Sequence, residues 1–267
     1  MNILIIGKPF DSLINLIKKS KLLSKIYTTE PIEGLANIEF LDLDDLVYKA
    51  KSLQIDIIIN LKNDLVESGM AEIFKKNRLT LFSVNKKWLN LEKSRIAAKK
   101  LLTYYSINVP ETILAPLAFP VVLKTNDDSA TEFIYSMDEL IEKKSKYLNQ
   151  QTYIEEYLEG EIFDLLALWD GFNIIFLNDI PNSNEVKDDR LELFKTKLHI
   201  MLSDEHADFM GFFTTRLIWS KNDWYVKEFI MGINEKSAIN KIKTDFLYIL
   251  SSAVYQKLNE IDLSLHN

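Results

Sequence analysis

The 267-residue sequence contains no cysteine and only three histidines. Disulfides, thiolate metal sites and a cysteine nucleophile are therefore excluded, and the absence of cysteine is compatible with a reducing compartment. The histidines His199, His206 and His266 are scattered, and none has a second histidine at the spacing of metal ligands. A histidine-based metal site is not expected.

Glycine is also scarce, because seven glycines in 267 residues compare with an average usage of about 7%. Few positions therefore allow a positive φ or a close approach of backbone to a ligand. No two glycines are near neighbours, so neither a GxGxxG turn nor a P-loop can be present. The glycines are Gly7, Gly34, Gly69, Gly160, Gly171, Gly211 and Gly232.

Long apolar runs and an excess of positive charge are missing as well. No run of about 18 apolar residues is present to span a bilayer, and the opening MNILIIG has no basic residues before its short apolar run. That opening predicts a buried strand and not a signal peptide. The net charge of −7 repels phosphate backbones and anionic membrane surfaces. We expect a cytoplasmic protein that binds neither nucleic acid nor membranes.

The composition, with 47% hydrophobic and 27% charged residues, predicts a folded globular chain of two or three compact units. Over residues 1–85, short apolar strands alternate with amphipathic helices, and this alternation predicts a parallel sheet with helices on both faces. The predicted strands are 2–7, 25–30, 38–43, 55–60 and 79–84, and the predicted helices are 12–25, 42–54 and 67–78.

A second unit follows residues 90–112, which predict a helix that ends before Pro110 because proline lacks an amide donor. Strands at 119–125, 132–136, 152–158, 161–171 and 173–179, with a helix at 137–148, predict one mixed α/β lobe. The polar residues 181–189 predict a loop. A helix at 190–207, a hairpin formed by 210–220 and 223–232, and a helix at 239–261 complete the chain.

Several segments, taken in order, resemble the ATP-grasp enzymes, and more specifically glycinamide ribonucleotide synthetase (phosphoribosylamine-glycine ligase). Each segment alone is weakly specific, but together they cover most of the chain. They are MNILIIG, LEKSRIAAKKLLTYYSINVPET, PVVLKT, YIEEYLEGEIFDLLALWDG and GFFTTRLIWSKNDWYVKEF. The resemblance implies an N-terminal parallel, Rossmann-like α/β lobe (pre-ATP-grasp) over 1–90. It also implies a two-lobed ATP-grasp core, with a linking helix and small lobe over 91–178 and a large lobe over 179–267. From this resemblance we expect the family's C-terminal domain to be absent.

The family's function is to use ATP and magnesium to form an acyl phosphate from glycine, a step of purine biosynthesis. By resemblance, Lys124 matches the strand lysine that contacts the phosphates, and Arg95 stands where the family has an earlier lysine. Glu155, Glu156, Tyr157 and Leu158 match the hinge that meets the adenine. Glu161 lies near the position where a carboxylate of the family binds the ribose hydroxyls. Glu228 matches a magnesium-binding glutamate. Solvated lysines, arginines and acidic turns are the alternative interpretation of these residues.

The departures from the family pattern gather at the phosphate and metal end of the site. The second metal ligand, an asparagine, is replaced by Ile230, which cannot coordinate a hard cation. The glycine-rich turn after the first strand is GKPFDS, which keeps Gly7 alone. Where the family has a glycine-rich lid, this chain has TNDDSATEF. We expect the acids of this segment, Asp127, Asp128 and Glu132, to repel a triphosphate. A glycine-rich segment before the last sheet is shortened to residues 181–189.

Three hypotheses follow. The first is a non-catalytic ATP-grasp protein, a pseudoenzyme with at most weak adenine nucleotide binding, that acts through an unidentified protein partner or as a homo-oligomer. The second is an active ATP-dependent carboxylate-amine ligase that uses Lys124, Arg95 and Glu228, with a substitute metal ligand such as Glu235. The third is a scaffold with an oligomer face built from Trp88, Trp219 and Trp224. The sequence leaves the acceptor, the partner and the source of the missing domain open.

Overall fold

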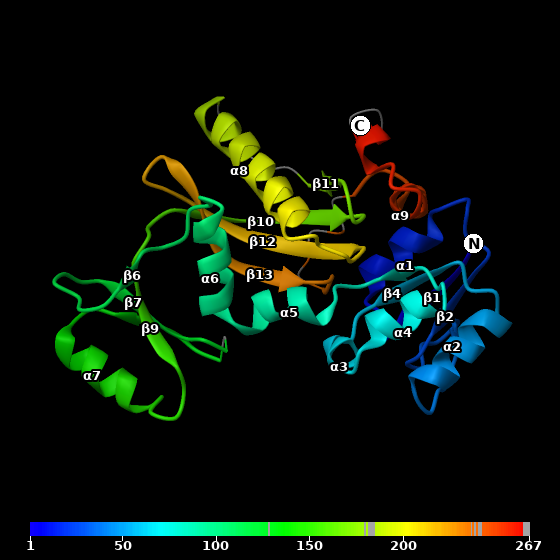
Figure 1. Cartoon of the computed structure of the whole chain (residues 1–267), viewed down its shortest axis with the longest axis horizontal. Helices are drawn as coiled ribbons and strands as arrows, with labels where there is room; N and C mark the ends of the chain where they lie inside the picture. Colours follow the sequence, from blue (N-terminus) through cyan, green and yellow to red (C-terminus); the bar gives the residue numbers. More distant parts are fainter. Residues whose placement is uncertain are drawn as a thin grey trace.

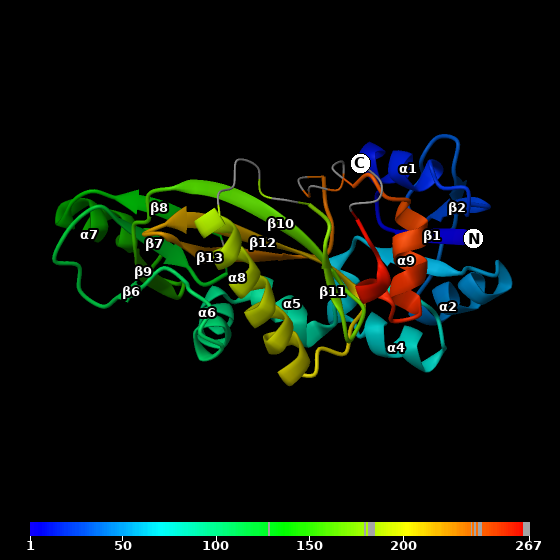
Figure 2. The same ribbon diagram turned by 90° about the horizontal axis from the view of Figure 1, so that it is seen from above.

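The computed structural model describes residues 1–127, 129–178, 180, 185–235, 237, 239 and 242–263. The molecule is elongated, with the N-terminal lobe at one end, a large sheet in the middle and a small lobe at the other end (Figure 1). In the turned view of Figure 2, the last helix, α9 (Phe246–Val254), lies beside the N-terminal lobe. The end of the described chain therefore packs against its beginning.

The N-terminal lobe is a five-stranded parallel sheet with the strand order β3-β2-β1-β4-β5. Its strands are β1 (Asn2–Ile6), β2 (Lys25–Thr28), β3 (Ala36–Asn37), β4 (Ile57–Asn60) and β5 (Leu81–Phe82). Its helices are α1 (Asp11–Lys18), α2 (Leu43–Ser52), α3 (Asn63–Glu67) and α4 (Met70–Lys76).

Both faces of this sheet are buried, and the central strand β1 presents apolar side chains to each face. Ile3 and Ile5 share a core with α1 and α9, whereas Leu4 and Ile6 share one with α2 and α4. The predicted parallel sheet with helices on both faces is confirmed. One strand differs, because β3 is shorter than the predicted strand 38–43 and lies just before it.

The prediction of a single helix that starts near residue 90 and ends before Pro110 is wrong in that the helix is not single. Two helices occupy this region, α5 (Lys86–Lys93) and α6 (Arg95–Tyr104), and they meet at Ser94. Ser94 has an extended backbone (φ −129°, ψ 94°), and its side-chain oxygen accepts a hydrogen bond from the N–H of Ala97. Serine at this position satisfies an orphan donor of the first turn and so favours a new helix start.

The large sheet is antiparallel, with the order β11-β10-β12-β13. Its strands are β10 (Glu161–Trp169), β11 (Ile174–Phe176), β12 (Gly211–Ser220) and β13 (Asp223–Met231). The sequence pattern assigns β10 and β11 to the small lobe, but the pairing of β10 with β12 places both strands here. Helix α8 (Glu185–Asp204) begins inside the predicted loop 181–189, and residues 181–184 lie outside the described part.

The small lobe is a sheet of order β6-β9-β7-β8 with helix α7 (Met137–Ser145) on one face. Its strands are β6 (Thr112–Ile113), β7 (Val121–Thr125), β8 (Thr131–Ile134) and β9 (Thr152–Glu156). Val121, Leu123, Ile134, Leu140 and Ile154 form a core of their own. Because this core is separate from the two large ones, we expect the small lobe to be able to move as a body.

The proposed tryptophan face is also wrong. Trp88 and Trp224 are only 2% and 1% exposed, and Trp219 packs edge-on against Trp224 with the ring centroids 5.0 Å apart. The final helix is shorter than the predicted 239–261 and begins after Asp245, whose carboxylate accepts hydrogen bonds from Leu247 and Tyr248. Among the described residues, no helix combines the length and apolar character needed to cross a bilayer.

Candidate functional site

A cleft lies where the small sheet meets the large sheet, beside the short hinge 157–160 that joins β9 to β10. Apolar side chains from both sheets enter it, namely Val122 of β7 and Ile218 of β12. Its lining residues are Pro110, Val122, Lys124, Thr131, Phe133, Glu155, Glu156, Tyr157, Leu158, Ile218 and Lys227. At its mouth the rings of Phe133 and Tyr157 meet edge-on, with centroids 5.9 Å apart. The cleft therefore offers a flat apolar group contact surfaces from both sheets.

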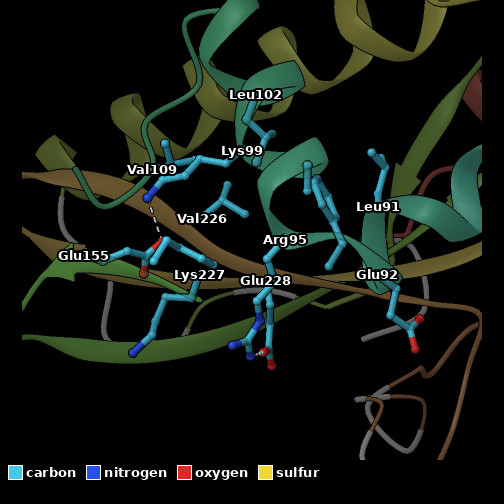
Figure 3. Close-up of a pocket in the computed structure, with 13 residues that line it drawn as sticks. Leu91, Glu92, Arg95, Lys99, Leu102, Val109, Glu155, Val226, Lys227 and Glu228 are labelled. Carbon is cyan, nitrogen blue, oxygen red and sulfur yellow. Dashed lines mark hydrogen bonds and ion pairs between the residues drawn. The ribbon is translucent and has the colours of Figure 1, made fainter. Parts of the chain in front are cut away.

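Glu155 is the centre of a buried ion-pair cluster at one end of this cleft. One carboxylate oxygen lies 2.7 Å from Nζ of Lys124, and the other lies 2.6 Å from Nζ of Lys99. The side chains of Glu155 and Lys124 are both 5% exposed. Burial lowers the pKa of Lys99, while the charge of Glu155 opposes that shift. The carboxylate thus holds two ammonium groups in place, and its contact with Lys99 is visible in Figure 3.

A second network runs across three neighbouring strands of the large sheet, β10, β12 and β13. Arg216 of β12 makes a bidentate contact with Asp164 of β10, at 2.8 and 2.9 Å. Its third contact is with one carboxylate oxygen of Glu228 on β13. The other oxygen of Glu228 lies 3.4 Å from Nη2 of Arg95, which comes from α6. Both oxygens of Glu228 therefore face guanidinium groups.

Lys227 is a third lysine close to Glu155, and a β-bulge positions it. Arg216 pairs with Glu228, and Leu217 pairs with Val226, so Lys227 has no partner in the register. It lines the cleft and also the adjoining pocket beside α6. Burial lowers the pKa of Lys227, and the charge of Lys124 adds to that shift. In the described part of the chain, its ammonium has no hydrogen bond or ion pair.

The structure brings most of the predicted site residues together. Lys124, Glu155, Glu156, Tyr157 and Leu158 line one cleft, and Arg95 lies beside it through a hydrogen bond of 3.0 Å to the hydroxyl of Thr131, which also lines the cleft. Glu161 is different. Along β10, Glu161 and Phe163 point to one face of the sheet, because side chains alternate between the two faces. Glu161 therefore projects from the face opposite Asp164, which contacts Arg216. Asp164, and not Glu161, is the acid that β10 presents on the side of Arg216.

The turn between β7 and β8, which corresponds to the family's lid, is tied to helix α6. The backbone N–H of Ile96 donates to the side-chain oxygen of Asn126 (2.9 Å), and the N–H of Arg95 donates to the Asn126 carbonyl (3.0 Å). Asp127 accepts hydrogen bonds from the N–H and hydroxyl of Ser129, which lower its pKa. Side-chain hydrogen bonds within the turn and to α6 therefore hold this segment in place.

The expected repulsion of a triphosphate by the lid acids is corrected in part. Glu132 projects from the far side of β8, toward α7, where it contacts Lys143 at 3.0 Å and the hydroxyl of Tyr147 at 2.9 Å. These hydrogen bonds lower the pKa of Glu132. Asp127 is engaged in the turn, and Asp128 lies outside the described residues. Thr131 and Phe133 are the residues of β8 that line the cleft.

Four residues of this site were missed in the sequence: Lys99, Asp164 and Arg216 of the two networks, and Lys227 beside them. Lys99 follows Arg95 by four positions, which places both side chains on one face of a helix. Asp164 and Arg216 are single charges inside otherwise apolar strands, and such charges are usually paired. Those two signals were available. The orientation of Lys227 depends on the β-bulge, and no sequence pattern predicts that bulge.

The metal-binding potential of Glu228 is limited by its surroundings. Ile230, two residues on, offers no donor, and the alternative ligand Glu235 is exposed and lines neither pocket. Among the described residues, no group of three or more His, Cys, Asp or Glu side chains is placed to hold a metal ion. Because both oxygens of Glu228 already face guanidinium groups, these residues do not fit a magnesium ion between protein and phosphate.

Glu92 on α5 gives a pH-dependent prediction in the adjoining pocket (Figure 3). Burial raises the pKa of Glu92 above its usual value, the charge of Glu228 also raises it, and the N–H of Met231 lowers it. The folded chain then holds this proton more tightly than the unfolded chain, so the free energy of unfolding falls as pH rises through the folded pKa. Glu92→Gln should raise that free energy at pH 7 by up to about 1 kcal/mol, given partial exposure.

Urea titrations of Glu92→Gln at pH 4 and pH 7 check this prediction. The gain should be present at pH 7 and absent at pH 4, because the wild-type carboxyl is protonated there. Glu72→Gln, which changes an exposed helix carboxylate, serves as the control and should show the same small difference at both pH values. A gain of equal size at both pH values for Glu92→Gln would contradict the electrostatic cause.

No family model matches the chain. Among curated proteins, the phosphoribosylamine-glycine ligase of Fusobacterium nucleatum subsp. nucleatum is 22% identical over 282 residues, which are 87% of this chain and 66% of that protein. The phosphoribosylamine-glycine ligase of Clostridium acetobutylicum is 22% identical over 306 residues, 93% of this chain and 73% of that protein. This chain thus spans about two thirds to three quarters of the length of these relatives.

Solved structures agree with the fold. The crystal structure of phosphoribosylamine-glycine ligase from Thermotoga maritima superposes with a TM-score of 0.72 at 16% identity, covering 98% of this chain and 76% of the other. D-alanine-D-alanine ligase from Bacillus anthracis, complexed with ATP, gives a TM-score of 0.63 at 17% identity, covering 98% and 99%. The chain therefore has the ATP-grasp fold and is similar in sequence to phosphoribosylamine-glycine ligase along most of its length.

Proposed function

We propose that this chain binds an adenine nucleotide in the cleft and does not catalyse ligation with it. Val122, Leu158 and Ile218 provide apolar contacts for a base, and the hinge offers backbone groups next to them. Lys124, Lys99 and Lys227 provide positive charge at the adjoining end, where Glu155 pairs with Lys124 and Lys99 and Lys227 lines the same cleft. This arrangement suits a ligand with an apolar ring and an anionic tail.

The observation that carries the loss of catalysis is the pairing of Glu228 with Arg95 and Arg216. Acyl phosphate formation places negative charge on the transferred phosphoryl group, and ligases of this kind stabilise that charge with metal ions and preorganised donors. Here the one matching carboxylate is neutralised, and its neighbouring ligand position is Ile230. Loss of a single transition-state donor can cost about 2.7 to 4 kcal/mol, so combined losses reduce turnover to background.

A phosphate-release assay tests the proposal. The purified chain is incubated with ATP, magnesium and glycine, and then with phosphoribosylamine added, in parallel with Lys124→Ala. We expect the wild-type chain and the variant to release phosphate at the same background rate. Glycine-dependent release well above that of Lys124→Ala would show an active carboxylate-amine ligase and overturn the proposal.

Binding is measured separately, by titration calorimetry with ATP. We expect saturable heat in the wild-type chain and at least tenfold weaker binding in Lys124→Ala, because a charge-assisted contact to phosphate is lost. An absence of heat at millimolar ATP would contradict nucleotide binding and leave a role in protein interaction alone.

A further inference from the structure

In this chain, protein cations face Glu228, the carboxylate that by resemblance matches the family's magnesium-binding glutamate. Magnesium needs near-octahedral oxygen ligands and is usually held by one or two carboxylates together with the phosphates of a substrate. Glu228 is the single matching carboxylate, and guanidinium groups of Arg95 and Arg216 face its two oxygens. A divalent cation entering here would have to displace an arginine and remain next to it, which like-charge repulsion opposes.

Arg216 is fixed in this position and still has donors to offer. Asp164 holds it by two parallel hydrogen bonds, and Glu228 takes a third. A guanidinium group carries five N–H donors, so the remaining ones have no partner in the described structure. The side chain of Arg216 is 29% exposed, so these donors are within reach of a ligand.

Lys227 supplies a further cation on the same strand as Glu228. In Figure 3 its side chain extends to the same side of β13 as the Arg95–Glu228 pair. It lines both the cleft and the adjoining pocket, and its ammonium is without a partner among the described residues. A half-buried, unpaired ammonium is costly unless an anion completes its environment.

From these contacts we propose that the cleft takes a phosphate-bearing anion free of divalent metal, with Arg95, Arg216 and Lys227 in the place of the metal ion. The inference rests on the proposed nucleotide binding and adds its ionic form. The free nucleotide carries more negative charge than its magnesium complex, so the cation cluster should favour the free form. Binding should also weaken as salt concentration rises, because the attraction is screened.

The test is calorimetry of the full chain with ATP under two conditions, one with EDTA and one with excess magnesium. The expected dissociation constant in EDTA is equal to or lower than that in magnesium. Lys227→Met should weaken binding in EDTA about tenfold or more. Lys100→Met is the matched control, since Lys100 is an exposed lysine on α6 beside Lys99, and it should bind within about twofold of wild type.

The outcomes separate this inference from the proposed function. Binding that is at least tenfold weaker in EDTA than in magnesium overturns the metal-free inference and leaves nucleotide binding intact. Equal binding by Lys227→Met and Lys100→Met removes Lys227 from the site and overturns the inference in that part. An absence of binding under both conditions overturns both proposals. Circular dichroism of each variant confirms that the fold is retained before affinities are compared.

Discussion

Replacing Glu155 by alanine is expected to lower the free energy of unfolding by about 3 to 5 kcal/mol. The carboxylate lies between the ammonium groups of Lys99 and Lys124, at 2.6 and 2.7 Å, and is itself 5% exposed. Its removal leaves two positive charges in a buried place without a counter-charge. Chemical denaturation of the purified variant measures the loss, with an unchanged m-value as the sign that the unfolded state is the same.

Two further variants separate charge from packing at this position. Glu155→Gln keeps the size of the side chain and removes its charge, so it should lose nearly as much stability as the alanine variant. Glu156→Ala alters the next residue, whose partner Lys221 is 55% exposed, and should cost at most about 1 kcal/mol. Near-normal stability of Glu155→Gln would mean that packing, and not the charge cluster, explains the effect.

A methyl group at Gly160 is expected to cost about 3 kcal/mol of stability, the upper end of the usual range for overpacking. An alanine Cβ at this position would lie 1.9 Å from the carbonyl oxygen of Trp219 and 2.9 Å from its carbonyl carbon. The obstacle is backbone in the interior of a sheet, so strand β12 or the hinge must shift. Because the hinge carries Tyr157 and Leu158, Gly160→Ala should also weaken ATP binding in the calorimetric assay.

Gly34→Ala is the comparison for this variant. Gly34 has a positive φ of 75°, but no neighbouring atom lies within 4 Å of the place that an alanine Cβ would take. The substitution therefore adds backbone strain of about 1 kcal/mol without a collision. Thermal and urea unfolding of the two variants should rank Gly160→Ala well below Gly34→Ala. Equal losses would contradict the close approach of hinge and strand, and unchanged ATP affinity would disconnect the hinge from the cleft.

Local sequence patterns predicted the helices and strands of this fold more successfully than they predicted which strands pair with one another. The alternation of apolar strands and helices predicted the N-terminal parallel sheet, and the turn after β12 was identified from residues 221–223. Lys221 and Asn222 both adopt a positive φ there, as a two-residue hairpin turn requires. The apolar run of β10 also identified a strand, but strand character does not specify the neighbouring strand, and β10 was therefore assigned to the wrong sheet.

The site was predictable where a single segment carries it and unpredictable where register decides. Lys124 and the hinge 155–158 lie within short stretches that resemble the family, and the structure places them in one cleft. The contact of Arg216 with Asp164 and Glu228 depends on the alignment of three strands and on the bulge at Lys227. Glu132 was misjudged because its side of β8 follows from the pairing with β7 and from α7, not from its charge.

In the proposed complex, arginines and not magnesium complete the phosphate end of this cleft. The most direct test is a crystal structure of the chain grown with a non-hydrolysable ATP analogue and excess magnesium. We expect a phosphate chain contacted by Lys124, Lys227 and Arg216, with Glu228 still bound to its arginines. A magnesium ion at about 2.0 to 2.1 Å from a carboxylate oxygen of Glu228, with Arg216 moved aside, would contradict it.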